Sequence, residues 1–209
     1  MITRLGKLIT IAIAIVALGL TALLVSGYQA SAHESRFQAQ LRDAYGQRVG
    51  TVDFRIGRHA MTVDAEFQWN QNVTPNQFHG FHVHANNDLA NGEGCIANPD
   101  EPRNTWFVSA DGHLSATGLT HGAHQGDLPS PLIGQDGTAR LRFTTDRLDP
   151  ELLRGRVVIL HANPDNFGNV PTGTASAQYS PNTAAATDLT DRTGNAGDRM
   201  ACGVIRRSR

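Results

Sequence analysis

Short runs of alternating apolar and polar residues dominate the chain from residue 37 onward. The segment FQAQLRDAYGQRVGTVDFRIG (37–57) alternates on both sides of its glycines, and AMTVDAEFQWN (60–70) follows with the same period. In the second segment the apolar positions are Met61, Val63, Ala65 and Phe67. A period of two places such side chains on one face of a β-strand. We therefore expect strands in both segments, joined by turns.

The same pattern continues to the end of the chain. Further strands are expected in FHGFHVHA (78–85), TARLRFTTD (138–146), the continuous apolar run GRVVILHAN (155–163) and RMACGVI (199–205), with one short helical turn in LDPELLRG (148–155). Short strands at this spacing, without a sustained helical period, are typical of an antiparallel sandwich or barrel. The sequence therefore predicts an all-β domain.

Two long segments lack strand character, residues 85–136 and 162–198. Both are rich in Asn, Gly and Asp, and the first also carries several histidines. Loops of this length inside a compact domain are usually functional or disordered. We expect the first to be functional, and we interpret TASAQYSPNTAAATD (174–188) in the second as a flexible, solvated tract.

The first 32 residues have the pattern of an export signal. A basic start with Arg4 and Lys7 precedes an apolar run over residues 8–25, and Ala30-Ser31-Ala32 is an A-x-A cleavage site. This combination predicts a secretory signal peptide, with 33–209 as the mature domain. The apolar run is long for a signal and slightly short for a spanning helix, so an uncleaved membrane anchor is the alternative. In both cases the domain is exported: secreted, periplasmic or in the cell envelope.

Charge and cysteine content narrow the function classes. The whole chain has a formal net charge of −1, and removing residues 1–32 leaves 16 basic against 19 acidic residues, about −3. A basic nucleic-acid-binding surface is therefore not expected. Two cysteines, Cys95 and Cys202, in an exported chain predict a disulfide, with free thiols as the alternative.

Seven of the nine histidines fall between His79 and His161, in three spacings that suit metal binding. Besides His79, they are the H-x-H pair His82 and His84, the single residues His113 and His161, and the histidines of the run H-x-x-H-x-x-D formed by His121, His124 and Asp127. Copper and zinc favour imidazole nitrogen, supplemented by carboxylate. H-x-H alone is equally compatible with two strand-face histidines, but the combined set predicts a metal site.

Four segments together resemble one protein family. They are GFHVH (80–84), HQGDLP (124–129), VVILHANPDNFGN (157–169) and GNAGDRMACGVI (194–205). In this order they resemble the copper–zinc superoxide dismutases, over roughly residues 37–206. The resemblance implies an eight-stranded antiparallel Greek-key barrel, immunoglobulin-like, with two long functional loops. It also implies an enzyme that disproportionates superoxide, its small-molecule substrate, to O2 and hydrogen peroxide.

The resemblance also implies a role for each site residue. Copper would be bound by His82, His84, His113 and His161, and zinc by His113, His121, His124 and Asp127, so that His113 bridges the two ions. The catalytic residues would be His113 and Arg199, an arginine that attracts the anionic substrate. Asp165 and His79 would hold the ligand histidines in place, and Cys95 and Cys202 match the family disulfide.

Two alternatives stay open at the level of sequence. The spacing between His121 and His124 is shorter than the family usually has, which leaves a copper-only dismutase without zinc as one alternative. The other is a non-enzymatic copper-binding or copper-buffering protein on the same fold, and the presence of Arg199 favours the enzyme over it. The motifs are shared by monomers and homodimers, so both oligomeric states stay open.

Overall fold

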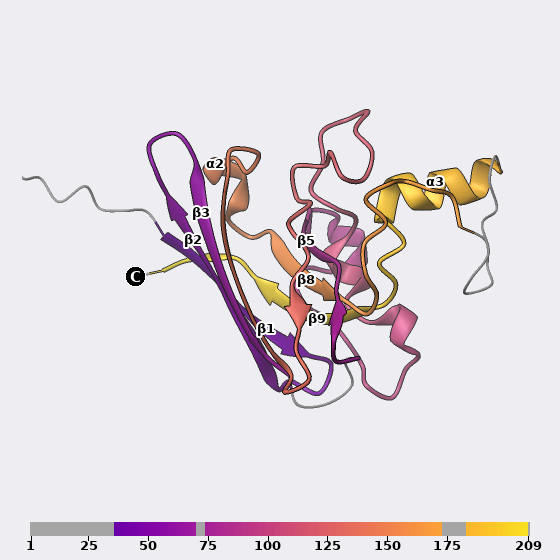
Figure 1. Ribbon diagram of the computed structural model, residues 1–209, viewed down its shortest axis with the longest axis horizontal. Coiled ribbons are helices and arrows are strands. Elements are labelled where there is room, and N and C mark those ends of the chain that lie inside the picture. Colours follow the sequence, from indigo (N-terminus) through magenta and orange to yellow (C-terminus); the bar gives the residue numbers. More distant parts are fainter. Residues whose placement is uncertain (1–35, 70–73, 173–182, 209) are drawn as a thin grey trace, which may run out of the picture. The chain divides into compact units, whose positions relative to one another are not determined.

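The computed structural model of the chain describes residues 36–69, 74–172 and 183–208 (Figure 1). The strands are β1 (Arg36–Asp43), β2 (Arg48–Ile56), β3 (Met61–Gln68), β4 (Gln77–Phe78), β5 (Phe81–His84), β6 (Leu132–Ile133), β7 (Thr138–Thr145), β8 (Val157–His161), β9 (Arg199–Val204) and β10 (Arg206–Arg207). The helices are α2 (Pro150–Leu153), α3 (Ala184–Thr193) and the 3-10 turns η1 (Leu89–Asn91), η2 (Arg103–Thr105) and η3 (Val108–Ala110). The predicted signal or anchor, residues 1–32, lies outside the described residues. No helix in the described part of the chain is long and apolar enough to cross a membrane.

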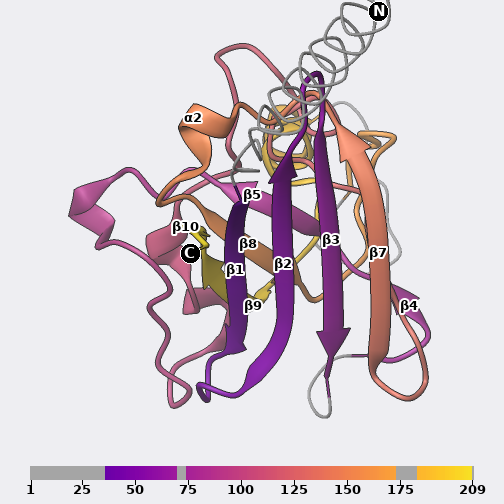
Figure 2. The same cartoon turned by 90° about the vertical axis from the view of Figure 1, so that its left-hand side faces the viewer.

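The strands form one large antiparallel sheet and one small one. The large sheet has eight strands in the order β5-β8-β9-β1-β2-β3-β7, with β10 beside β1, and β4 pairs with β6. Figure 2 shows the long strands β1, β2, β3 and β7 side by side, curling away from β5, β8 and β9. This half-barrel confirms the predicted all-β antiparallel fold and is consistent with a Greek-key barrel.

The core lies between the two halves of the curled sheet. The four apolar residues of β3 that alternate in the sequence, Met61, Val63, Ala65 and Phe67, are all buried. Phe67 on β3 meets Phe81 on β5 edge to face, with 5.5 Å between ring centroids. These strands lie far apart in the sheet order, so the contact shows that the sheet folds back on itself. Burying each such phenylalanine stabilises the fold by roughly 1.5–3 kcal/mol.

The second long segment differs from the sequence prediction. The flexible tract was expected to reach residue 188, but α3 begins at Ala184. Its first turn is capped by the Thr183 hydroxyl, which accepts a hydrogen bond from the backbone N–H of Ala186 at 3.3 Å. Gly194 ends the helix in the left-handed region, at φ 58°. Residues 173–182 of the tract lie outside the described residues.

A smaller apolar cluster holds the first long segment against the sheet. Trp106, Phe107 and Ala110 of the loop pack on Val157 and Ile159 of β8, together with Cys202 of β9. The loop that precedes His113 is therefore packed against the same strands that carry metal-ligand candidates.

Candidate metal centre

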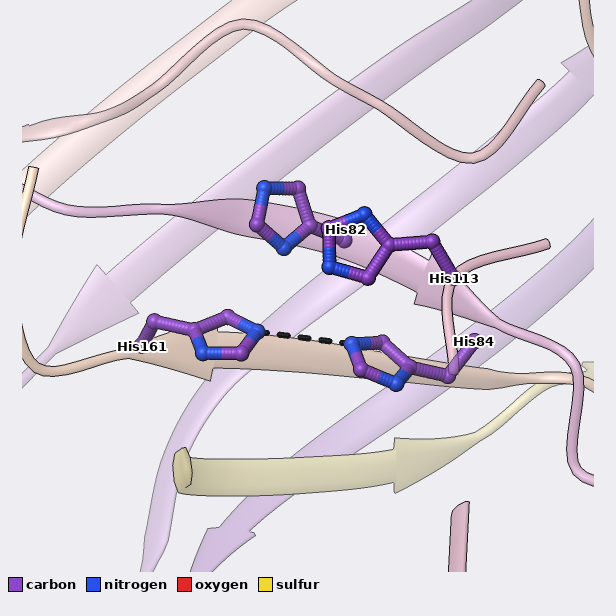
Figure 3. Close-up of side chains that lie close together, drawn as sticks. All are labelled: His82, His84, His113 and His161. Carbon is purple, nitrogen blue, oxygen red and sulfur yellow. Dashed lines mark hydrogen bonds between the residues drawn. The ribbon is translucent and has the colours of Figure 1, made fainter. Parts of the chain in front are cut away.

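Four imidazoles converge where β5 meets the end of β8. His82 and His84 lie on β5, His161 ends β8, and His113 approaches from the long loop (Figure 3). Each offers one ring nitrogen, and these four nitrogens lie within 4.8 Å of one another. His82, His84 and His161 are at most 4% exposed. The H-x-H pair is therefore not a pair of solvent-facing polar residues.

The orientation of three rings is set by acceptors behind them. His84 Nδ1 donates to the carbonyl of Asp111 at 2.8 Å, and His161 Nδ1 donates to the carbonyl of Gly197 at 3.0 Å. His82 Nε2 donates to the Asp165 carboxylate at 2.9 Å, which leaves His82 Nδ1 buried without a hydrogen-bond partner. A carbonyl only accepts, so each ring must keep its proton on the outer nitrogen.

This arrangement leaves unshared electron pairs facing one another. Burial lowers the pKa of His161 to about 3 and holds the pKa of His84 well below its ordinary value, so both rings are neutral near pH 7. Their Nε2 atoms lie 3.3 Å apart, and with both protons on Nδ1 neither can donate to the other. A buried polar atom without a partner is costly. A cation between these nitrogens satisfies them, so the donor set fits copper, which favours imidazole.

A second group adjoins the first through His113. Its Nδ1 lies 2.9 Å from Asp127 Oδ1 and 3.3 Å from His124 Nδ1. Ligand atoms of His82, His113, His121 and Asp127 lie within 4.8 Å of one another. His124, predicted as a zinc ligand, lies outside that tightest set, although its Nδ1 is 3.4 Å from Asp127 Oδ2. With nitrogen and carboxylate donors together, this group fits zinc.

The charges around Asp127 and His113 favour the forms of these two residues that bind a metal. Although burial opposes it, hydrogen bonding and attraction from His113 lower the pKa of Asp127, which is therefore ionised. Burial lowers the pKa of His113, so its ring is neutral near pH 7. Burial also acts to lower the pKa of His121, but the carboxylates of Asp165 and Asp127 outweigh it and raise that pKa.

Asp165 joins the two groups from behind. Its carboxylate, which is fully buried, accepts from His82 and lies 3.4 Å from His121 Nε2. The Ser130 hydroxyl donates to its other oxygen at 3.1 Å. A side chain at Gly80 would come within 2.9 Å of Asp165 Oδ1, so glycine is required there. Such outer partners set which ring nitrogen is free for a metal.

His79 lies behind the first group rather than in it. The side chain is fully buried, and its Nδ1 is 2.9 Å from the carbonyl oxygen of His161. It therefore contacts the backbone of a ligand candidate and is absent from both sets of converging ligand atoms among the described residues.

Arg199 lines a cleft beside the imidazoles. It lies with His84, His113 and His161 in the wall of a cleft of about 560 Å³. Its guanidinium donates to the carbonyl oxygens of Phe107 and Asp111, both at 2.5 Å. Burial lowers the pKa of Arg199 from its usual value, but an arginine keeps its charge near pH 7. A fixed positive group therefore faces the cleft beside the four imidazoles.

Sequence reasoning missed Asp111 in this region. Its carbonyl accepts from both His84 and Arg199, and its backbone has a positive φ of 62°. Its carboxylate accepts from the backbone N–H groups of Asn87 and Asp88, at 2.7 and 2.8 Å. The Asp-Gly dipeptide before His113 signals a turn, but nothing in the sequence shows that a carbonyl in that turn holds a ligand.

The predicted disulfide is present. Cys95 and Cys202 are bonded, with 5.5 Å between their Cα atoms and 107 residues between them in the sequence. Cys202 lies on β9, three residues after Arg199, and Cys95 lies in the loop whose Phe107 carbonyl holds the same arginine. The bond therefore ties together the two chain segments that position Arg199.

Comparison with known proteins agrees with this geometry. Residues 48–205 match the family model described as copper/zinc superoxide dismutase. The chain belongs to the copper/zinc superoxide dismutase family. This membership confirms the predicted enzyme, a superoxide dismutase whose cofactors are copper and zinc.

Individual relatives support the same conclusion. A superoxide dismutase [Cu-Zn] of Mycolicibacterium paratuberculosis (strain ATCC BAA-968 / K-10) is 37% identical over 77% of this chain and 69% of the relative. An extracellular superoxide dismutase [Cu-Zn] of Brugia pahangi is 31% identical over 80% of this chain and 73% of the relative. Among solved structures, the clock protein EA4 superposes with a TM-score of 0.55 at 24% identity, covering 82% of this chain and 94% of that chain, which shows a shared fold.

Proposed function

We propose that this dismutase holds copper through His82, His84, His113 and His161, and zinc through His113, His121, His124 and Asp127. The observation that carries the copper assignment is the pair of facing Nε2 atoms of His84 and His161, 3.3 Å apart, with the unpartnered Nδ1 of His82 in the same group. When bound, copper supplies the one-electron chemistry that superoxide disproportionation requires.

The chain itself binds, orients and protonates. Arg199 holds a small anion in the cleft beside the imidazoles, because its charge is permanent and its outer position is set by two carbonyls. His113 Nδ1 is engaged by Asp127 in the second group, which leaves Nε2 as the atom that can take up a proton and deliver it to the product. Asp165 keeps His82 and His121 in the tautomers that suit the two groups.

Metal analysis alongside a superoxide dismutation assay tests these roles. Protein loaded with both ions is expected to bind one copper per chain and to bind zinc more weakly. His161→Ala should abolish activity, whereas Asp127→Ala should lose zinc and keep copper. His59→Ala, at an exposed position outside the site, serves as the control and should change neither. Full activity in His161→Ala protein would contradict the assignment.

We infer that the domain acts outside the cytoplasm. Three features support export: the A-x-A site at residues 30–32, the Cys95–Cys202 disulfide, which persists in oxidising compartments, and the similarity to an extracellular relative. Amino-terminal sequencing of protein from soluble and membrane fractions tests the inference. A soluble protein that begins at His33 is expected, whereas Met1 on membrane-bound protein would establish the anchor and overturn cleavage.

A further inference from the structure

A groove separate from the metal cleft lies between β10 and the turn that follows α2. It has a volume of about 760 Å³, and Arg154, Arg156, Arg206 and Arg207 contribute to its wall. Glu93 is the one acidic side chain in that wall, so the groove carries a local formal charge of +3 while the whole chain carries −1. None of the residues that line the metal cleft also lines this groove.

The backbone brings these arginines together from two distant parts of the chain. The N–H of Gly155 donates to the carbonyl of Ile205 at 3.0 Å, and the N–H of Ile205 donates to the carbonyl of Arg156 at 2.8 Å. Two hydrogen bonds therefore hold the turn after α2 against the start of β10. Arg154 and Arg156 lie on one side of this connection and Arg206 and Arg207 on the other, so the positive charge is concentrated only when the chain is folded.

Within the described residues, three of the four groove arginines, Arg154, Arg156 and Arg206, have no acidic partner. Arg154 and Arg206 are exposed, and within the described residues neither side chain has an ion pair or a hydrogen bond. Arg156 donates to the carbonyls of Leu152 and Ala85, which neutralises none of its charge. By contrast, Arg140 and Arg142 on β7 both lie within 4 Å of acidic side chains. The groove therefore differs from an ordinary exposed strand face, on which opposite charges alternate.

The groove also lies where the folded unit begins. β10 pairs with the first residues of β1, with Phe37 opposite Arg207, and the N–H of Ser208 donates to the carbonyl of Arg36 at 2.9 Å. In the sequence, residues 26–36 separate this point from the apolar run 8–25, and eleven extended residues span at most about 40 Å. The arginines are thus tied to the end of the domain from which the predicted membrane segment departs.

We propose that this arginine groove docks on the phosphate headgroups of anionic lipids at a membrane surface. Guanidinium groups pair with phosphate through two parallel hydrogen bonds, and basic side chains next to a membrane segment are attracted to an anionic surface. With the anchor retained, the groove orients the domain on the membrane; with it cleaved, the groove alone provides the attraction. The groove and the metal cleft share no lining residue, so docking through the groove does not use the residues of the cleft. The export proposed above determines which membrane the domain contacts, but the binding of the groove to lipid headgroups does not depend on it.

Vesicle sedimentation with the predicted mature chain, residues 33–209, tests the proposal. This chain contains every residue of both apolar clusters and the whole family match, so it carries its own core. The probes are vesicles of phosphatidylcholine alone and the same vesicles with about one third phosphatidylglycerol. The double variant Arg154→Gln/Arg206→Gln is compared with Arg140→Gln/Arg142→Gln, which removes the same charge from β7. Dismutation activity and the circular dichroism spectrum verify that each protein is folded.

Binding to the anionic vesicles, and little to the neutral ones, is expected for the unchanged chain. The groove variant should bind roughly thirty-fold more weakly, since each arginine at an anionic surface contributes about a factor of five. The β7 variant should bind within about three-fold of the unchanged chain, because screening confines the effect of distant charges. Dismutation activity should be unaffected, so this result is separable from any failure of the metal assignments.

Several outcomes would overturn the proposal. They are equal binding to neutral and anionic vesicles, no binding to either, and an equal loss in the two double variants. Displacement from anionic vesicles by millimolar inorganic phosphate would indicate a single-ion site in place of a membrane surface. Tighter binding to a duplex DNA oligonucleotide than to the vesicles would assign the groove to nucleic acid.

Discussion

Removing the Asp165 carboxylate should weaken the zinc half of the centre far more than the copper half. In the Asp165→Ala variant, His82 Nε2 loses its acceptor at 2.9 Å and His121 Nε2 loses its neighbour at 3.4 Å. His84 and His161 are unaffected, because backbone carbonyls orient their rings. Of the four proposed copper ligands, only His82 loses a hydrogen-bond partner. His121 loses the one carboxylate that, among the described residues, lies within 4 Å of its Nε2.

The size of the effect follows from the role of such outer partners. Their removal typically costs 10–100-fold in metal affinity, so zinc affinity should fall by about that factor and copper affinity by less than about tenfold. Asp165→Asn keeps an acceptor oxygen but loses the charge, and a neutral hydrogen bond has roughly half the strength of a charged one. The zinc affinity of this variant should therefore lie between that of the unchanged protein and that of Asp165→Ala.

Competition with chelators of known affinity measures both constants. Asp146→Ala removes an exposed carboxylate after β7 and serves as the control, with no expected change in either metal. An equal loss of copper and zinc affinity in Asp165→Ala protein, or an unchanged zinc affinity, would refute the reasoning. Either result would mean that the 3.4 Å contact with His121 does not orient that ring.

Three further predictions concern other parts of the molecule. Arg199→Ala should slow dismutation at low salt by roughly tenfold or more, because the positive charge that attracts superoxide is lost. The rate of the variant should also depend less on salt, at unchanged copper content. Identical rates and salt profiles for the two proteins would show that Arg199 does not attract the substrate. Arg147→Ala removes a hydrogen bond of 3.0 Å to the carbonyl of Gly122, in the short loop that carries His121, His124 and Asp127. Such a bond contributes about 1 kcal/mol, so zinc affinity should fall about fivefold in chelator competition, and Arg147→Lys should recover part of the loss. An unchanged zinc affinity would show that the loop keeps its shape without this contact. Replacing Cys95 and Cys202 together by serine should lower the free energy of unfolding, measured by urea titration, by about 4.8 kcal/mol, because the unfolded chain regains the entropy of a loop with 107 residues of separation. A change below about 1 kcal/mol would show that other contacts already constrain this loop.

The strands could be predicted because their environment repeats with the period of the backbone. In β3, every apolar residue at alternate positions is buried, and two of its polar residues, Glu66 and Gln68, are exposed. The H-x-H pair could be predicted for the same reason, since positions i and i+2 of a strand share a face. The disulfide followed from the expected compartment and the even cysteine count. Each of these inferences needed only local geometry or composition.

Helix α3 could not be predicted from apolar periodicity because it has almost none. Thr190 is its one buried residue, so there is no apolar stripe for a period of 3.6 residues to reveal. The available signals were the caps, Thr183 before the helix and Gly194 after it, together with the i, i+4 pair of Asp188 and Arg192. These signals are weak beside an Ala- and Thr-rich composition that is typical of flexible tracts.

The acceptors behind the histidines were also beyond the reach of sequence. Asp111 and Gly197 hold ligand candidates through backbone carbonyls, which every residue has, so no residue type marks the role. Both positions have a positive φ, 62° and 78°, and a turn with this conformation is what directs each carbonyl at an imidazole. Only the fold of two loops, brought together across the sheet, shows which carbonyls are used.

The two halves of the centre therefore differ in how much of their geometry exists before a metal binds. In the copper half, two strands supply three imidazoles, and backbone carbonyls orient two of them, so little conformational entropy remains to be lost on binding. In the zinc half, His121, His124 and Asp127 come from one short loop whose orientation depends on side-chain contacts with Asp165 and Arg147. If zinc binds there as proposed, it must order part of its own site, so we expect it to bind more weakly than copper. A site built on the sheet should keep its shape when the loop relaxes, and we therefore expect the copper group to persist in variants of the zinc loop such as Asp127→Ala.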